Sequence, residues 1–190
     1  MNQREKQILA VRNHILKDRK VLCTGNPDRY GTIASGIKTV WPETTFIHLS
    51  NGFDFNDIDA KPEKYSSLFR NHNTFINASY VNGIQVKLLK LCQKHMPVGD
   101  VFNIGSTHEY DGLGTEEYKQ NKLELREISL ALNTFRFQTC HVVLGGIDTG
   151  KKTTAEWMKP KKIAEILKWI TLQESYKIPI IGIDQPKKPF

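Results

Sequence analysis

The chain has 190 residues, a size that suits one domain and is too small for two ordinary ones. Hydrophobic residues make up 39% and charged residues 25% of the sequence, which excludes a disordered or fibrous chain. The formal net charge is +7, but the basic residues are spread thinly and no aromatic ladder accompanies them. We therefore expect a solvated surface and no nucleic-acid partner.

The sequence contains no apolar stretch with the length of a signal-peptide core or a bilayer span. We therefore expect a cytoplasmic protein without membrane contact. Cys23, Cys92 and Cys140 lie singly within apolar segments, a pattern that suits reduced core thiols better than disulfides or a metal site.

The first predicted element is a leading amphipathic helix within residues 1–19. Apolar residues recur there at near-helical spacing between residues 2 and 17, namely Ile8, Leu9, Val11, Ile15 and Leu16. Residues 20–185 are predicted to form the main domain, and residues 186–190 a tail.

Strand and helix patterns alternate along the main domain. Strands are predicted at residues 20–24, 45–49, 74–77, 100–104, 139–144 and 178–183. Helices are predicted at residues 30–40, 62–70, 81–94, 115–133 and 160–172. Because such alternation is typical of parallel βαβ units, we predict an α/β fold, a Rossmann-type doubly wound parallel sheet of about six to seven strands with helices on both faces. Ligands of such folds bind beyond the carboxyl ends of the strands.

The turn after the first strand is one candidate binding segment. Residues 24–31 read Thr-Gly-Asn-Pro-Asp-Arg-Tyr-Gly between a strand and a helix. Glycines let backbone amides approach a pyrophosphate, and the positive end of the following helix favours its charge. An ordinary glycine-containing loop fits these residues equally well when they are taken alone. The candidate dinucleotide contacts are Gly25, Asn26, Arg29, Tyr30 and Gly31.

A second candidate lies at the start of the helix predicted at 115–133. Tyr118 and Lys122 are four positions apart, which places the phenol and the ammonium on one helical face. The cation favours the tyrosinate form that general acid-base chemistry uses. Taken alone, the pair is more often a solvated surface pair. Ser106, just after the strand at 100–104, adds a third polar group at the ligand-binding edge and favours an active site.

Together these residues resemble the short-chain dehydrogenase/reductase family, over residues 20–183. The family's TGxxxGxG loop is matched by Thr24, Gly25 and Gly31, with Arg29 in place of the middle glycine. Further motifs are matched in order: the NNAG segment by Asn77 and Ala78, the Asn-Ser-Tyr-Lys tetrad by Asn82, Ser106, Tyr118 and Lys122, and the PG-x-x-x-T turn by Gly145 and Thr149. The chain is shorter than typical members of the family, which implies a reduced substrate lid.

The resemblance implies an NAD(P)-dependent oxidoreductase that transfers a hydride between a nicotinamide cofactor and a carbonyl or alcohol substrate. By the same resemblance, Tyr118 is the general acid/base, Lys122 holds the ribose hydroxyls and tunes the phenol, and Ser106 polarises the carbonyl. Asn82 supports a proton-relay water. The remaining implied cofactor contacts are Asp54, Asn77, Ala78 and Thr149.

The end of the second strand bears on cofactor choice. NAD-preferring Rossmann domains place an acid there against the ribose hydroxyls. This chain instead has Ser50 and Asn51, with Arg29 in the neighbouring loop. We therefore expect NADP(H) to be favoured over NAD(H).

Two other functions fit parts of the sequence. Gly145 to Lys151 nearly spells a phosphate-binding P-loop, which would make the protein an NTPase, although Lys152 stands where a magnesium-binding Ser or Thr belongs. Arg29 and the reduced lid are also compatible with a dinucleotide-binding sensor that lacks turnover.

The helices predicted at 81–94 and 115–133 carry apolar residues on more than one face, which predicts a second covered surface. We therefore expect a homodimer or homotetramer with two-fold symmetry through these helices, as the resemblance also implies.

Overall fold

The structure is a computed structural model that describes residues 3–79, 81, 83–111, 114–132, 134, 137–149, 157–173 and 178–184. The strands are β1 (Val21–Thr24), β2 (Thr45–Ile47), β3 (Thr74–Asn77), β4 (Gly99–Ile104), β5 (Phe137–Leu144) and β6 (Ile180–Ile183). The α-helices are α1 (Gln3–Leu16), α2 (Ile33–Val40), α3 (Pro62–Asn71), α4 (Ile84–His95), α5 (His108–Asp111), α6 (Glu116–Ala131) and α7 (Pro160–Thr171). Two 3-10 helices, η1 (Leu49–Asn51) and η2 (Phe55–Asp57), follow β2.

Within these residues, the six strands form one parallel sheet in the order β2-β1-β3-β4-β5-β6. The predicted doubly wound α/β fold is confirmed. The chain steps outward from β1 to β2 and then returns to place β3 on the other side of β1. The carboxyl ends of β1 and β3 therefore form the switch point at which ligands of such sheets bind.

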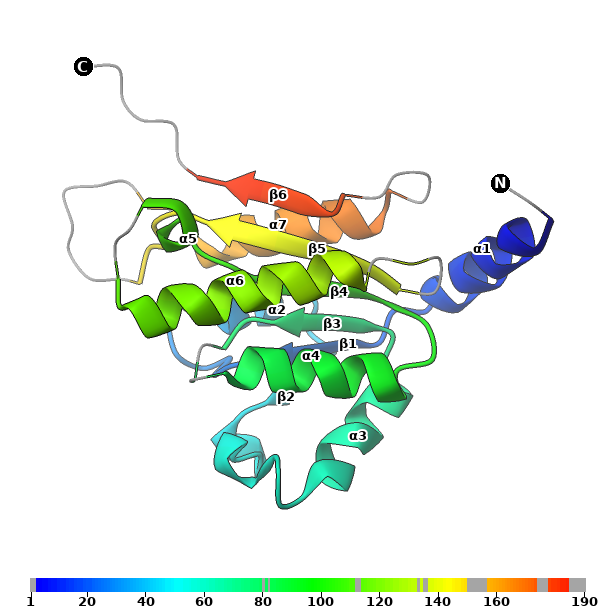
Figure 1. Ribbon diagram of the computed structural model, residues 1–190, viewed down its shortest axis with the longest axis horizontal. Helices are drawn as coiled ribbons and strands as arrows, with labels where there is room; N and C mark the ends of the chain where they lie inside the picture. The colour runs from blue at the N-terminus through cyan, green and yellow to red at the C-terminus, as the bar shows by residue number, and fades with distance from the viewer. Residues whose placement is uncertain are drawn as a thin grey trace.

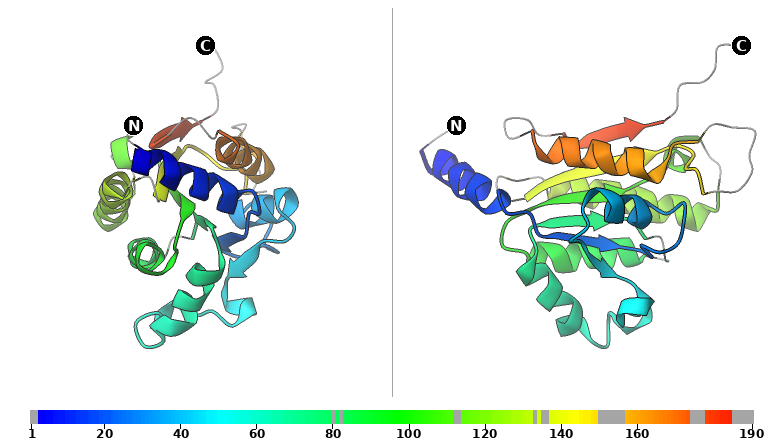
Figure 2. Two further views of the ribbon diagram at one scale, coloured as in Figure 1. Left: turned by 90° about the vertical axis from the view of Figure 1, so that its right-hand side faces the viewer. Right: turned by 180° about the vertical axis from the view of Figure 1, so that it is seen from behind.

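Helices cover both faces of the sheet (Figure 1). Helices α4 and α6 lie on one face, and α2 and α7 pack together on the other, which is seen from behind in Figure 2. Each face has its own apolar core. Leu22, Phe75 and Val101 contribute to the core under α4, and Cys23 and Ile76 contribute to the core under α2 and α7, as the alternation of strand residues requires.

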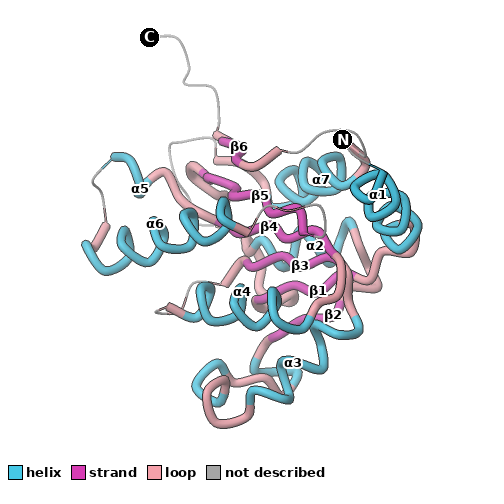
Figure 3. Tube along the Cα trace, turned by 45° about the vertical axis from the view of Figure 1, so that its right-hand side comes forward, coloured by secondary structure: helices cyan, strands magenta, loops and turns pink. Residues whose placement is uncertain are grey.

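Strands β2 and β6 are the two edge strands of the sheet in the described residues. The chain after β2 passes through η1 and η2 into α3, which lies beside α4 rather than over the centre of the sheet (Figure 3). Capping residues set where two helices begin. Asp54 caps the start of η2. The hydroxyl of Thr32 accepts the N–H of Ser35, so that α2 begins at Ile33, later than predicted.

The apolar face predicted for the leading helix is wrong. Ile8 and Ile15 are each 37% exposed and Val11 is 58% exposed, whereas Leu16 and the charged Arg12 are buried. The last turns of α1 dock on the rest of the protein. The guanidinium of Arg12 there binds Asp100, a buried acid of β4. This ion pair overrides the hydrophobic pattern.

The second apolar face of α4 is covered within this chain. Leu88 and Leu89 are 0% and 1% exposed, because α4 packs against the sheet, α3 and α6. This arrangement removes α4 as a reason to expect an oligomer, while Leu130 on α6 stays 39% exposed. No helix in the described part of the chain is long and apolar enough to span a membrane.

Candidate functional site

A cavity of about 450 Å³ lies at the switch point, between the segments that follow β1, β2 and β3. Five of the predicted cofactor contacts line it: Gly25, Asn26, Arg29, Asp54 and Ala78. His48, Leu49 and Asn56 also line it, although the sequence did not single them out.

The turn at Gly25 is held by the side chain of Thr24, which binds backbone N–H groups of the loop after the neighbouring strand. The hydroxyl of Thr24 accepts the N–H groups of Ala78 at 2.7 Å and Ser79 at 2.8 Å, which ties the end of β1 to the loop after β3. Gly25 has φ +121°, and a Cβ there would lie 3.1 Å from the Cβ of Ala34. Only glycine fits this close approach without strain.

The cavity also meets the amino end of α2. Ile33 and Ala34, the first residues of this helix, line the cavity, and the guanidinium-bearing Arg29 lines it from the preceding loop. The positive end of a helix and a guanidinium both attract phosphate. This wall of the cavity therefore suits a diphosphate or a monophosphate group.

Several predicted cofactor contacts do not line the cavity. Tyr30 is 71% exposed. The hydroxyl of Ser50 lies 2.8 Å from Nδ1 of His48, and the amide of Asn51 donates to the carbonyl of Phe46. Strand β2 ends at Ile47, and η1 then turns Ser50 and Asn51 away, so that His48 and Leu49 occupy the position predicted for them.

Gly31 and Thr149 touch one another. Gly31 has φ +75°, and a Cβ there would lie 2.3 Å from the Cα of Thr149. The glycine turn after β1 and the loop after β5 are therefore in direct contact at this point, outside the cavity lined by Gly25.

The side chain of Asn77 also lies away from the cavity. It is fully buried and donates to the carbonyl of Gln85 at 2.8 Å and to Oδ1 of Asn103 at 3.0 Å. Asn77 therefore supports the face of the sheet under α4, and only its neighbour Ala78 reaches the cavity.

Lys122 and Tyr118 lie together at the carboxyl end of β4. The ammonium of Lys122 donates to Oε1 of Gln85 at 2.6 Å and to the carbonyl of Ile104 at 2.7 Å. Its Nζ lies 5.5 Å from the centroid of the Tyr118 ring. Lys122 is 3% exposed, and burial lowers its pKa to about 8, although the carboxylate of Glu109 acts in the opposite direction.

Ser106 follows the same strand end, two residues after Ile104. Its N–H donates to Oε1 of Glu109 at 2.8 Å, and its Oγ accepts the N–H of His108 at 3.3 Å. Three of the four predicted tetrad residues, Ser106, Tyr118 and Lys122, thus gather around the end of β4. Asn82 lies outside the described residues.

A layer of buried polar side chains crosses the sheet next to Ser106 and Lys122. Asn77, Asn103 and His141 are paired in register across β3, β4 and β5 and face α4 and α6. Asn103 donates to the hydroxyl of Ser129 at 3.1 Å. Nε2 of His141 lies 3.0 Å from each carboxylate oxygen of Glu109.

The sequence did not assign roles to Gln85, Asn103, Glu109 or His141. Polar residues inside apolar strands, as in Val101-Phe102-Asn103-Ile104, were the available signal, because buried polar groups need hydrogen-bond partners. The partners could not be identified, since they come from helices far away in the chain.

The P-loop interpretation is not supported where it can be examined. Helix α7 begins only at Pro160, and Met158 pairs with Ile147 in an isolated parallel bridge before it. A P-loop leads directly into its helix, and residues 150–156, where that helix would begin, lie outside the described residues. Lys151 lies outside the described residues.

No family model and no curated protein sequence matches the chain. The fold is similar to that of solved dehydrogenases and reductases. One is a dehydrogenase/reductase from Sinorhizobium meliloti 1021, with a TM-score of 0.66 and 14% identity over 94% of this chain and 97% of the other. Another is a short-chain dehydrogenase/reductase from Serratia marcescens, with a TM-score of 0.62 and 17% identity over 86% of this chain and 95% of the other.

A third similar structure is a 3-ketoacyl-(acyl-carrier-protein) reductase from Brucella melitensis complexed with NADH. The TM-score is 0.63 and the identity 12%, over 87% of this chain and 96% of that one. At these identities the likeness establishes the fold: the chain has the Rossmann-like architecture of short-chain dehydrogenases/reductases.

Proposed function

We propose that this protein is an NAD(P)-dependent oxidoreductase of the short-chain dehydrogenase/reductase family that interconverts a small carbonyl compound and its alcohol. The observation that carries the proposal is the buried ammonium of Lys122, 5.5 Å from the ring centroid of Tyr118 at the carboxyl end of a Rossmann-like sheet. A lysine is rarely buried without a functional or structural partner.

The residues around the switch-point cavity fit the adenosine diphosphate part of a nicotinamide dinucleotide. Gly25 admits close approach of the backbone, and Arg29 and the amino end of α2 supply positive charge. Asp54 lines the same cavity as a hydrogen-bond acceptor for the adenosine hydroxyls or amine. When bound, the cofactor supplies or accepts the hydride.

The protein's own groups then handle the proton. The hydroxyl of Tyr118 gives a proton to the carbonyl oxygen during reduction and takes one from the alcohol during oxidation. Lys122 holds positive charge beside the phenol, and its bonds to Gln85 and Ile104 keep it there. Ser106, fixed through its backbone by Glu109, orients the substrate oxygen.

A dinucleotide-binding sensor without turnover is the second candidate. The switch-point cavity is lined by segments after β1, β2 and β3, and Ser106, Tyr118 and Lys122 are not among its described lining residues. Gly31 and Thr149, which touch one another, are also not among its described lining residues. The adenosine half of a dinucleotide would occupy this cavity without reaching Tyr118.

Parallel fluorescence titrations with NADPH, NADH and MgATP separate these functions. Binding of a nicotinamide dinucleotide, followed by its oxidation in the presence of a panel of aldehydes and ketones, supports the oxidoreductase. Binding without turnover supports the sensor. Tight binding of MgATP alone would contradict both.

We further propose that NADP(H) is favoured over NAD(H). Arg29 lines the cavity, and a cation near the ribose binds a 2′-phosphate. Arg29→Gln should weaken NADPH binding about tenfold or more, as expected for a lost charge-assisted contact, and leave NADH binding almost unchanged. Equal losses for both cofactors would place Arg29 at the diphosphate instead.

We also propose a homodimer or homotetramer formed through α6, on which Leu130 is exposed. Light scattering at micromolar concentration tests this proposal. A monomer in that experiment would refute it without touching the proposed reaction.

A further inference from the structure

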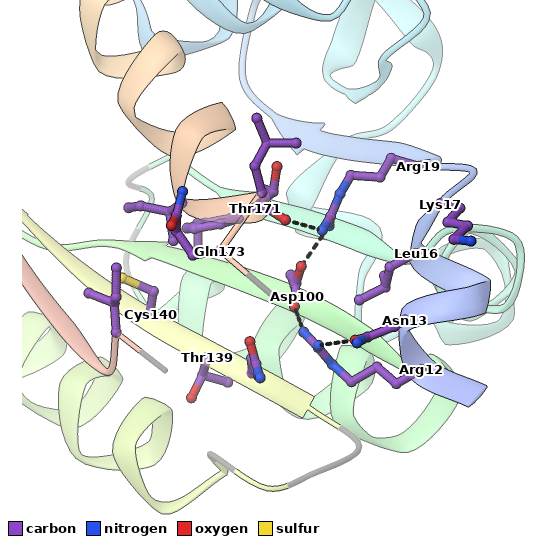
Figure 4. Close-up of a pocket in the computed structure, with 15 residues that line it drawn as sticks. Arg12, Asn13, Leu16, Lys17, Arg19, Asp100, Thr139, Cys140, Thr171 and Gln173 are labelled. Atoms are coloured by element: carbon purple, nitrogen blue, oxygen red, sulfur yellow. Dashed lines mark hydrogen bonds and ion pairs between the residues drawn. The ribbon is translucent and has the colours of Figure 1, made fainter. Parts of the chain in front are cut away.

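A second cavity lies at the opposite edge of the sheet from the proposed cofactor site. It has a volume of about 220 Å³ and lies at the amino ends of β4 and β5, between the last turns of α1 and the end of α7 (Figure 4). This volume is below the ~300–1,000 Å³ of typical sites for organic ligands, so it suits a small molecule.

One side of this cavity is apolar. Phe102 and Cys140 project from the sheet, Ile170 and Leu172 come from the end of α7, and Leu16 comes from α1. Phe102 and Cys140 are 2% and 4% exposed. Hydrocarbon placed against this wall would be removed from water.

The other side carries an excess of positive charge. Nη2 of Arg12 donates to Oδ1 of Asp100, and Nη1 of Arg19 donates to Oδ2 of the same carboxylate at 2.6 Å. Figure 4 shows both guanidinium groups turned toward Asp100. Two guanidiniums share one carboxylate, and Lys17 lies beside them on the cavity wall. Among the described lining residues, three are cationic and one is acidic.

The Arg12–Asp100 pair is buried, and Arg19, whose side chain is 16% exposed, carries the positive charge in excess. Arg12 is 3% exposed and Asp100 is 5% exposed. A buried charge is costly unless an opposite charge or hydrogen bonds compensate it. Arg19 has two further acceptors, the hydroxyl of Thr74 at 3.1 Å and the carbonyl of Thr171 at the end of α7, at 2.5 Å. A helix end offers only about half a negative charge, which does not balance a whole cation.

Arg12 also has a hydrogen-bond donor without an acceptor in the described part of the chain. Its Nε is buried and has no hydrogen-bond partner among the described residues. Buried donors of this kind are rare in folded proteins. An anion that entered the cavity would offset the excess charge.

We propose that this cavity binds a small organic monocarboxylate with an apolar body. Its carboxylate is bound by Arg12 and Lys17, and its hydrocarbon part packs against Phe102 and Cys140. A single negative charge matches the net +1 of Arg12, Arg19 and Asp100. The site is independent of the proposed oxidoreductase activity, because it lies at the other end of the strands.

Calorimetric titration of the full chain with butanoate, hexanoate and octanoate tests this proposal, with hexanamide and hexylamine as neutral and cationic controls of similar shape. At least one carboxylate should bind about tenfold or more tightly than hexanamide, and hexylamine should not bind. Failure of all three carboxylates, or equal binding of hexanamide, would overturn the proposal.

Variants locate the site. Arg12→Gln leaves Asp100 and Arg19 as a balanced pair, so it should fold and lose the preference for carboxylate over amide. Arg70→Gln is the matched control, since Arg70 pairs with Glu63 on an exposed surface elsewhere, and it should bind like the wild type. Unchanged binding in Arg12→Gln would contradict the assignment.

Two further variants test the site independently of whether Arg12→Gln folds. Lys17→Gln alters only an exposed residue at the rim and should weaken carboxylate binding a few-fold. Cys140→Leu keeps every charge but fills the apolar side, and should block binding while the circular dichroism spectrum stays unchanged. Binding of NADPH or NADH, if present, should be the same with and without saturating hexanoate.

Discussion

The ammonium of Lys122 and the side-chain amide of Gln85 form a buried hydrogen bond of 2.6 Å between two helices. Gln85 also donates to the carbonyls of Asn77 at 2.6 Å and Ile104 at 3.2 Å. One glutamine thus joins the ends of β3 and β4 to the lysine on α6. Gln85, together with the carbonyl of Ile104, holds Lys122 beside Tyr118.

Loss of Gln85 should therefore displace Lys122. Gln85→Leu removes the acceptor of the ammonium and the donor to two carbonyls, and should lower the free energy of unfolding by about 1–3 kcal/mol. Gln85→Glu should keep the contact and raise the pKa of Lys122, because a carboxylate favours the charged amine. Denaturant unfolding of both variants checks this. Equal destabilisation at all pH values would contradict it.

Lys122 should make stability depend on alkaline pH. Its pKa is lowered to about 8 by burial, so between that value and its ordinary range the unfolded chain binds more protons than the native protein. Its contribution therefore makes the native protein more stable as pH rises from about 8 to about 10.5, by about 3 kcal/mol in total. Below about pH 8 the buried amine of Lys122 is charged, so the full cost of its burial lowers the free energy of unfolding.

The comparison with Lys122→Met isolates this contribution from the other titrating groups. The difference in unfolding free energy between wild type and variant should change over that pH window and be flat below it. A difference that is flat throughout would show that Lys122 is not desolvated.

Tyr118→Phe tests the proposed acid/base. The ring and the helix remain, so dinucleotide binding should change less than about two-fold, while turnover should fall by roughly two to four orders of magnitude. Tyr110→Phe is the matched control, since Tyr110 is 61% exposed on the neighbouring α5. Ser106→Ala should lower turnover with little change in cofactor affinity. Wild-type turnover in Tyr118→Phe would favour the sensor.

Gly31→Ala tests the contact between the turn after β1 and the loop after β5. A Cβ at φ +75° is strained, and here it would also lie 2.3 Å from the Cα of Thr149. We expect a loss of about 2–5 kcal/mol from strain and overpacking together. Gly52→Ala has a similar φ of +79° but its nearest neighbour is the Nζ of Lys64 at 4.0 Å, so it should cost only about 1–2 kcal/mol. Thermal unfolding of both variants measures the difference, and equal costs would argue against the contact.

The sequence by itself determined the alternation of strands and helices, because apolar periodicity reflects burial of each segment whatever its neighbours are. It also determined the spacing of Tyr118 and Lys122 on one helix, since helical geometry places residues four apart on one face. Gly25 was predictable for the same kind of local reason, the turn that follows a strand and precedes a helix.

Only the tertiary structure decided which groups these residues meet. Asn77, Asn103 and His141 form one polar layer because the strands pair in a particular register, which no local pattern specifies. Arg12 is buried against Asp100, 88 positions away in the chain, so its burial contradicted the local apolar pattern of α1. The physical reason is that a buried polar group takes its partner from the elements packed around it, and this packing is set by the whole chain.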